Sequence, residues 1–324
     1  MSKIVKSILI GSLLLTNAMA KDSNTTTIKK EAIVVPTTDI QIFTTPNIDG
    51  KITPKTIGEA FTKAGFFISA NRNMNEPFIK QFKESSFDTY NLFTFYKKDI
   101  VLELAKKYPN VGLFAPMSMS IYSKKGSKTL SVSMLSANAM AKIMKIDKSE
   151  KLLVDLKKLV INTVQKAMPK GNFEKLPYTI QKPKGELVTT ISMEMDRDDW
   201  DEELEDFKMG FEGELATNGF IIAGQNNLGD EFEESNYTGF DFYEVYSICK
   251  LPVIYNIAKT RPEAGAFAPC SLYLEKKKDV NSMNIAFPSV YNWLSSLKIE
   301  NKKDIEVLED AQKRMKKLLL SLTE

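Results

Sequence analysis

The chain has 324 residues, of which 43% are hydrophobic and 26% are charged, and this composition is typical of a folded protein with about two domains. It contains no histidine, which excludes a Ser-His-Asp triad, a Cys-His nucleophile pair and imidazole ligation of zinc or haem. The formal net charge is only +3, so nothing in the balance of charges indicates a nucleic-acid partner.

The N-terminal segment has the pattern of a secretory signal peptide. Lys3 and Lys6 form a positive stretch, residues 8–15 form a short apolar core, and Ala18-Met19-Ala20 supplies the small residues that a signal peptidase recognises. The apolar core is too short to span a bilayer comfortably. We therefore predict cleavage after Ala20, export to the periplasm, and no membrane span after cleavage.

The segment after the predicted cleavage site divides into a leader, two α+β regions and a linker. Residues 21–32 are polar and lack periodicity, which is typical of a flexible leader. Residues 169–185 hold three prolines and no apolar periodicity, which predicts a linker. The remaining ranges, 33–168 and 186–324, are the predicted domains.

These two domains are copies of each other. Phe87-Asp88-Thr89-Tyr90 matches Phe240-Asp241-Phe242-Tyr243 at an offset of 153 residues. With that offset fixed, about 17 of the 60 positions from residue 87 to 146 are identical, without a gap. Self-similarity of this kind indicates an internal duplication, so each copy must bury equivalent surfaces.

Each copy has the same predicted order of elements, β-α-β-β-(α)-β-β-α. The first helix begins at Thr53-Pro54 in one copy and near Asp198 or Asp199 in the other, and a glycine, Gly65 or Gly219, follows its end. Aromatic and β-branched residues predict strands at 90–96 and 243–249, and Pro109 and Pro262 stop the short helices that follow. A hairpin and a final helix complete each copy. Hairpin-linked strands with intervening helices predict an antiparallel α+β sheet covered by helices.

Both faces of the predicted strands at 90–96 and 243–249 carry apolar residues, whereas a sheet covered on one side shows cleaner alternation. The simplest explanation is that the second face of each sheet packs against the other copy. We therefore expect the two copies to pair as an intrachain pseudo-dimer, with a cleft between them. The aromatic residues that we expect to line this cleft are Tyr90, Tyr96, Tyr243, Tyr246, Tyr291 and Trp293.

The second copy resembles a known family. The segment Ile248-Cys249-Lys250-Leu251-Pro252, followed by a helix and then by residues 268–274 (Ala-Pro-Cys-Ser-Leu-Tyr-Leu), is similar to a paired-strand pattern of the bacterial domain-of-unknown-function family 302. The first copy resembles it more weakly, with Tyr96 and Met117 in place of the cysteines. The resemblance implies a compact α+β domain, like a half-domain of the TATA-binding protein, that pairs with a second copy. It implies no activity.

Cys249 and Cys270 are the only cysteines, and three interpretations remain open for them. They could form a disulfide in an oxidising compartment, which would contribute roughly 3 kcal/mol for a loop of about 20 residues. They could be two separate buried thiols, because Cys270 shares its strand face with Leu272 and Leu274. They could also be redox-active, although reactivity requires a cation or helix N-terminus near the sulfur.

No motif for a cofactor, a phosphate group or paired catalytic carboxylates is present, and we predict neither a metal site nor a cofactor. The acidic run from Glu194 to Glu203 lacks the glycine and ligand spacing of a calcium loop and is typical of a solvated helix start. The sequence therefore favours a non-enzymatic, exported binding or accessory protein whose ligand is an unknown small molecule or envelope protein. The alternatives are a thiol-based redox protein that uses both cysteines and a structural subunit of an envelope complex.

Overall fold

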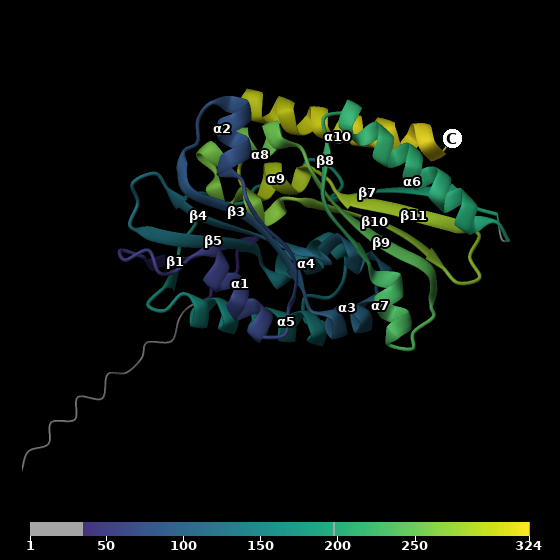
Figure 1. The fold of residues 1–324 in the computed structure, drawn as a ribbon, viewed down its shortest axis with the longest axis horizontal. Coiled ribbons are helices and arrows are strands. Elements are labelled where there is room, and N and C mark those ends of the chain that lie inside the picture. Colours follow the sequence, from purple (N-terminus) through teal and green to yellow (C-terminus); the bar gives the residue numbers. More distant parts are fainter. Residues whose placement is uncertain (1–34, 197, 324) are drawn as a thin grey trace, which may run out of the picture. The chain divides into compact units, whose positions relative to one another are not determined.

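A computed structural model describes residues 35–196 and 198–323. The predicted signal peptide and leader, residues 1–32, lie outside these ranges. The described chain contains two antiparallel sheets, each packed with helices, and the α+β prediction is confirmed. In Figure 1, α6 and α10 run along one side of the molecule, α1 and α5 run along the opposite side, and the sheets lie between them.

The first copy forms a sheet with the order β2-β3-β4-β5-β1-β6. Its elements are β1 (Ile40–Pro46), α1 (Pro54–Lys63), β2 (Phe67–Asn73), α2 (Asn75–Phe82), β3 (Phe87–Tyr96), α3 (Lys98–Ala105), the 3-10 helix η1 (Pro109–Phe114), β4 (Met117–Lys124), β5 (Thr129–Leu135), α4 (Ala137–Met144) and α5 (Lys151–Ala167). The short strand β6 (Asn172–Phe173) belongs to the predicted linker, yet it pairs with β1 and extends this sheet.

The second copy forms a sheet with the order β7-β11-β10-β9-β8, which is the order of the first sheet without β6. Its elements are β7 (Val188–Glu194), α6 (Trp200–Thr217), β8 (Ile221–Asn227), α7 (Leu228–Glu234), β9 (Phe240–Cys249), α8 (Leu251–Thr260), η2 (Pro262–Phe267), β10 (Cys270–Lys277), β11 (Ser282–Pro288), α9 (Tyr291–Ser296) and α10 (Lys302–Thr323).

The duplication is confirmed element by element. The bounds of β3, η1, β4 and β5 differ from those of β9, η2, β10 and β11 by 153 residues at both ends. Gly65 and Gly219 follow the first helix of each copy with φ angles of 80° and 76°, a left-handed conformation that glycine adopts without steric cost. A glycine therefore ends the equivalent helix in each copy.

The pairing of the copies as an intrachain pseudo-dimer is also confirmed, and its contacts are reciprocal. Tyr90 Oη donates to the carbonyl oxygen of Pro262 at 3.0 Å, and its counterpart Tyr243 donates to the carbonyl of Pro109, the counterpart of Pro262. A second exchange links the strands that follow. Ser118 Oγ donates to the Pro269 carbonyl at 2.9 Å, and Ser271 Oγ donates to the Pro116 carbonyl at 3.1 Å.

Each sheet is therefore buried on both faces, as the apolar residues on both faces of its strands predict. On β3, Phe93 and Phe95 pack on Phe61 of α1, with ring centroids 5.3 and 4.6 Å apart. Tyr90 and Leu92, on the opposite face, belong to a hydrophobic cluster built mainly from the second copy. Each of the two hydrophobic clusters combines the sheet and helices of one copy with strand residues and a short helix of the other.

Candidate functional site

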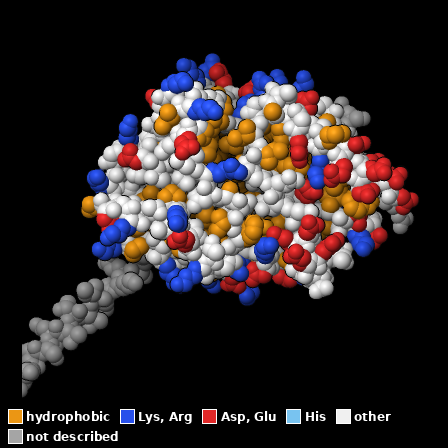
Figure 2. Space-filling view, in the orientation of Figure 1, with side chains coloured by type: hydrophobic (Ala, Val, Ile, Leu, Met, Phe, Trp, Pro, Cys, Tyr) orange, Lys and Arg blue, Asp and Glu red, His pale blue; other side chains and the backbone are white. Residues whose placement is uncertain are grey.

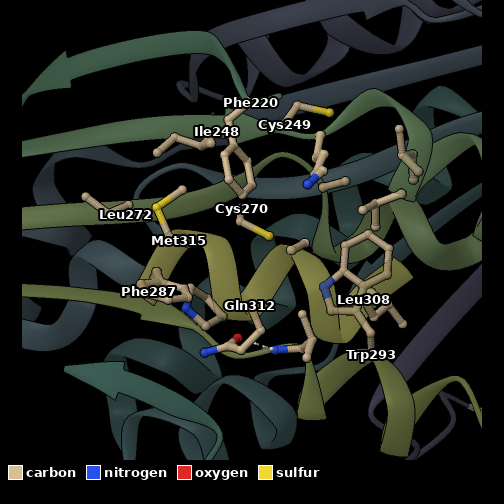
Figure 3. A pocket seen from close by; sticks show the side chains of 17 residues that line it. Phe220, Ile248, Cys249, Cys270, Leu272, Phe287, Trp293, Leu308, Gln312 and Met315 are labelled. Carbon is tan, nitrogen blue, oxygen red and sulfur yellow. Dashed lines mark hydrogen bonds between the residues drawn. The ribbon is translucent and has the colours of Figure 1, made fainter. Parts of the chain in front are cut away.

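An apolar cavity of about 70 Å³ lies in the second copy, between the sheet and α10 (Figure 3). Strands β9, β10 and β11 form its floor, α8 and α9 form its sides, and α10 covers it. The side chains labelled in Figure 3 are those of Phe220, Ile248, Cys249, Cys270, Leu272, Phe287, Trp293, Leu308, Gln312 and Met315. Ala311 also lines the cavity, and its short side chain leaves room that a larger residue on the same face of α10 would fill.

The cavity contains few polar groups, and they already have partners in the protein. Gln312 Oε1 accepts a hydrogen bond from the backbone N–H of Val290 at 3.1 Å, and its Nε2 donates to Thr189 Oγ1 at 2.6 Å. Lys250 pairs with Asp310 at 3.0 Å, and its ammonium group lies 5.0 Å from the centre of the Phe220 ring. An occupant would therefore meet a mainly apolar surface.

Cys249 and Cys270 both line this cavity, as free thiols. Cys270 lies opposite Ile248 in the antiparallel register, shares a hydrophobic cluster with Leu272 and Leu274, and directs its S–H to the Phe267 carbonyl at 3.3 Å. Both sulfur atoms therefore lie in a mainly apolar environment.

The environment of both thiols disfavours the thiolate form. Burial raises the pKa of Cys249 to about 12, and the nearby Cys270 contributes to this shift. Burial also raises the pKa of Cys270 to about 12, although a hydrogen bond with Trp293 works in the opposite direction. Only about one thiol in 10⁵ would be ionised at pH 7 with such a pKa, whereas nucleophilic cysteines need a lowered one.

The structure distributes the six aromatic residues expected at a cleft over several environments. Trp293 lines the apolar cavity and stacks on Phe267. Tyr90 and Tyr243 are fully buried between the copies, and the Tyr96 and Tyr246 rings are equally buried. Tyr96 Oη donates to Glu231 of the other copy and Tyr246 Oη to Glu212 of its own, each at 2.7 Å. Tyr291 packs against Gly185, where a Cβ atom would lie 2.4 Å from the ring.

The other features noted in the sequence have structural roles or lie at the surface. The acidic run near the start of α6 is largely exposed, and Figure 2 shows acidic side chains gathered at that end of the molecule. Within residues 35–196 and 198–323, no cluster of three or more cysteine or carboxylate side chains could hold a metal ion. No helix in these ranges is both long and apolar enough to cross a membrane.

Sequence reasoning did not identify Ala311, Gln312 or Phe220 as parts of this site. Ala311 belongs to the buried apolar face of α10, but the spacing of apolar residues alone does not show that a small residue there faces the sheet across a gap. A comparison of side-chain volumes between the two final helices would have been the available signal, because duplicated elements normally fill duplicated spaces.

The repeated α+β architecture and the paired copies define the class of protein, and comparison identifies the family. The model of the family DUF302, a domain of unknown function, matches residues 43–168 and 200–322, so the chain belongs to this family as tandem copies. A similar solved structure is that of an uncharacterized conserved protein DUF302 from Bacillus stearothermophilus, 15% identical, with a TM-score of 0.35. The match covers 43% of this chain and 100% of the other. No curated protein matches the sequence.

Proposed function

We propose that this protein is an exported, non-enzymatic binding protein of the periplasm, and that it holds a small apolar molecule, or the apolar end of a larger one, in its second copy. The observation that carries the proposal is the cavity of about 70 Å³ whose lining is mainly apolar and whose polar groups are already hydrogen-bonded. Small-molecule sites are typically apolar in this way, but this cavity is smaller than the roughly 300–1,000 Å³ of sites for drug-sized ligands, so its guest has only a few heavy atoms. Dry cavities lined by aliphatic and aromatic side chains take up small apolar guests.

Binding can be tested through Trp293, which lines the cavity. The Trp200→Phe variant leaves Trp293 as the sole tryptophan, because the chain has two. We expect benzene, or xenon under pressure, to produce a saturable change in its emission. Filling the cavity with Ala311→Leu in the same background should weaken this response at least tenfold.

The matched control is Ala216→Leu, which makes the same substitution at an exposed position of α6. It should bind the probes as the Trp200→Phe parent does. Equal binding by the Ala311→Leu and Ala216→Leu variants would refute the cavity as the ligand site.

Export is supported by the N-terminal sequence and has its own test. Expression in a Gram-negative host, followed by fractionation and N-terminal sequencing, should give a periplasmic protein that begins at Lys21. An intact N-terminus in the cytoplasmic fraction would contradict export and leave the apolar cavity as a separate question.

The redox alternative is favoured by the presence of both cysteines in one cavity and opposed by their raised pKa values. We expect an aromatic disulfide reagent at pH 7 to label the native thiols far more slowly than the urea-unfolded ones. Complete labelling of the native protein within minutes would instead support thiol chemistry. Mass spectrometry of the untreated protein, which separates thiols from a disulfide by two hydrogens, is the control.

The same thiols predict a pH dependence of stability. Below the ordinary thiol pKa of 9, both thiols are protonated in the folded and unfolded states. From pH 9 towards 12 the unfolded chain loses these protons while the folded chain retains them, so stability falls as the pH rises. Urea unfolding at pH 8 and pH 10.5 should show this loss. A variant with both cysteines replaced by alanine should lose less stability between these two pH values.

A further inference from the structure

Glu263 is a buried carboxylate that lacks a positive partner. It lies on η2, where the second copy packs on the first, and only 5% of its surface is exposed. Its Oε1 atom accepts a hydrogen bond from Tyr178 Oη at 2.7 Å. Within residues 35–196 and 198–323, no group donates a hydrogen bond to its Oε2 atom. The carboxylate also forms no ion pair in these ranges. Carboxylates this buried are normally paired, and Oε2 is not fully enclosed, so it stays open to a donor from outside the protein.

Glu263 lines a cleft of about 300 Å³ that both copies form. The first copy contributes Tyr122 and Ser131, the segment after α5 contributes Glu174, and the second copy contributes Arg261 and Glu263. Burial raises the pKa of Tyr122, and the negative charges of Glu263 and Glu174 raise it further. Both carboxylates therefore act on the same hydroxyl group from the walls of one cleft.

The positive groups in the cleft do not neutralise these carboxylates. Arg261 Nε donates to the Leu297 carbonyl at 2.8 Å, and its guanidinium lies 4.7 Å from the centre of the Tyr178 ring. Lys124 also lines the cleft, but across the described ranges neither it nor Arg261 forms an ion pair with Glu263 or Glu174. The cleft thus offers an unpaired carboxylate oxygen beside the Tyr122 ring and several serine and threonine hydroxyl groups.

We propose that this cleft binds a small organic ammonium cation, whose N–H groups donate to Glu263 and whose charge Glu174 also attracts. An ammonium group has three N–H donors, and the ring of Tyr122, which lines the cleft, can also attract a cation. A calcium ion takes six to eight oxygen ligands, whereas the described residues hold no cluster of three carboxylates. The volume lies at the lower end of the range for small-molecule sites. This site is separate from the apolar cavity and independent of its proposed function.

The test is calorimetric titration of the purified protein with n-butylamine, benzylamine and 1,4-diaminobutane, with n-butanol as the uncharged counterpart and calcium chloride as the metal probe. We expect at least one amine to bind and n-butanol not to bind. A hydrogen bond to a charged group contributes about 1.5–3 kcal/mol, so Glu263→Gln should weaken amine binding about 10- to 100-fold. Glu174→Gln should weaken it less, because Glu174 is exposed.

Glu59→Gln, at an exposed position of α1, is the matched control and should bind amines as the wild type does. Should Glu263→Gln fail to fold, as judged by circular dichroism, the comparison of Glu174→Gln with Glu59→Gln decides the question. The proposal is overturned if the amines bind no better than n-butanol, if the variants at both carboxylates bind like the wild type, or if calcium binds and the amines do not.

Discussion

The space between the sheet and the final helix exists in both copies, but it is about 20 Å³ in the first and about 70 Å³ in the second. When the buried positions of α5 and α10 are aligned, Leu153 matches Leu308, and Leu156 matches Ala311. At the start of the equivalent strands β4 and β10, Met117 of the first copy matches Cys270 of the second. The duplicated backbone thus sets the shape of the site, whereas a few side-chain volumes decide whether it is filled. A ligand site can therefore arise in one copy without a change of fold.

The largest expected effect comes from exchanging these volumes. Leu156→Ala should lower the free energy of unfolding by about 2–5 kcal/mol, because it opens a cavity in a filled core. Ala311→Leu should change it by less than about 1.5 kcal/mol, because the added methyl groups enter existing space. Urea unfolding at pH 7 measures both. An equal loss in the two variants would show that the second cavity is not free space and would remove the contrast between the copies.

A smaller difference is expected at the reciprocal tyrosines. Tyr243 Oη donates to Pro109 O and accepts from Gly112 N at 2.7 Å. Tyr90 Oη donates to Pro262 O at 3.0 Å, and the backbone of Gly265, the counterpart of Gly112, also interacts with it. Ser120 Oγ also donates to the Pro262 carbonyl at 3.2 Å, so this carbonyl still accepts a hydrogen bond when the Tyr90 hydroxyl is removed.

Tyr243→Phe leaves a buried carbonyl and a buried N–H without this partner and should cost about 2–3 kcal/mol. Tyr90→Phe should cost less, about 1–2 kcal/mol, because the Pro262 carbonyl keeps the Ser120 hydroxyl as a donor. Urea unfolding of both variants measures the difference, and the double variant tests additivity across the interface. If Tyr90→Phe proved the more costly, the asymmetry inferred from the hydrogen bonds would be wrong.

Much of the fold could be predicted because the duplication gave two sequences for one structure. The strands at 90–96 and 243–249, the glycines after the first helices and the prolines that open η1 and η2 all depend on local chemistry. The short helices α2 and α7 were not predicted. Each has only seven or eight residues, and such a helix depends on tertiary contacts such as that of Phe78 with Tyr255, which are not local in sequence.

The sites were harder to predict because both depend on contacts between distant residues. The apolar faces of β3 and β9 indicated that the copies pair, but they could not show that Tyr90 and Tyr243 would be fully buried. A sequence signal for this close packing existed in the segment Gly-x-Phe-Ala-Pro, which both copies share at residues 112–116 and 265–269. A Cβ atom at Gly112 would lie 2.6 Å from Tyr243 Oη, and one at Gly265 would lie 2.4 Å from Ser120 Cβ. A glycine kept in both copies can thus mark where the partner copy approaches.

The smallest predicted difference concerns the first helix of each copy, whose N-termini are capped differently. Thr53 Oγ1 accepts a hydrogen bond from Thr56 N at 3.2 Å, and Thr56 Oγ1 accepts one from Thr53 N at 2.9 Å. Asp199 occupies the same position before α6, but its side chain makes no capping hydrogen bond. The acidic residues of the first turn of α6, Asp201, Glu202 and Glu203, also repel its charge.

Thr53→Ala should therefore lower the free energy of unfolding by about 1 kcal/mol, the usual effect of losing an N-cap. Asp199→Ala should change it by less than about 0.5 kcal/mol, because the favourable interaction with the helix dipole is offset by the neighbouring charges. Thr53→Ser, which keeps the hydroxyl, is the matched control and should unfold like the wild type. Hydrogen exchange should become faster at the start of α1 in Thr53→Ala and remain unchanged at the start of α6 in Asp199→Ala. A larger loss in Asp199→Ala would mean that the charge near the helix N-terminus, rather than the capping hydrogen bond, holds these helices in place.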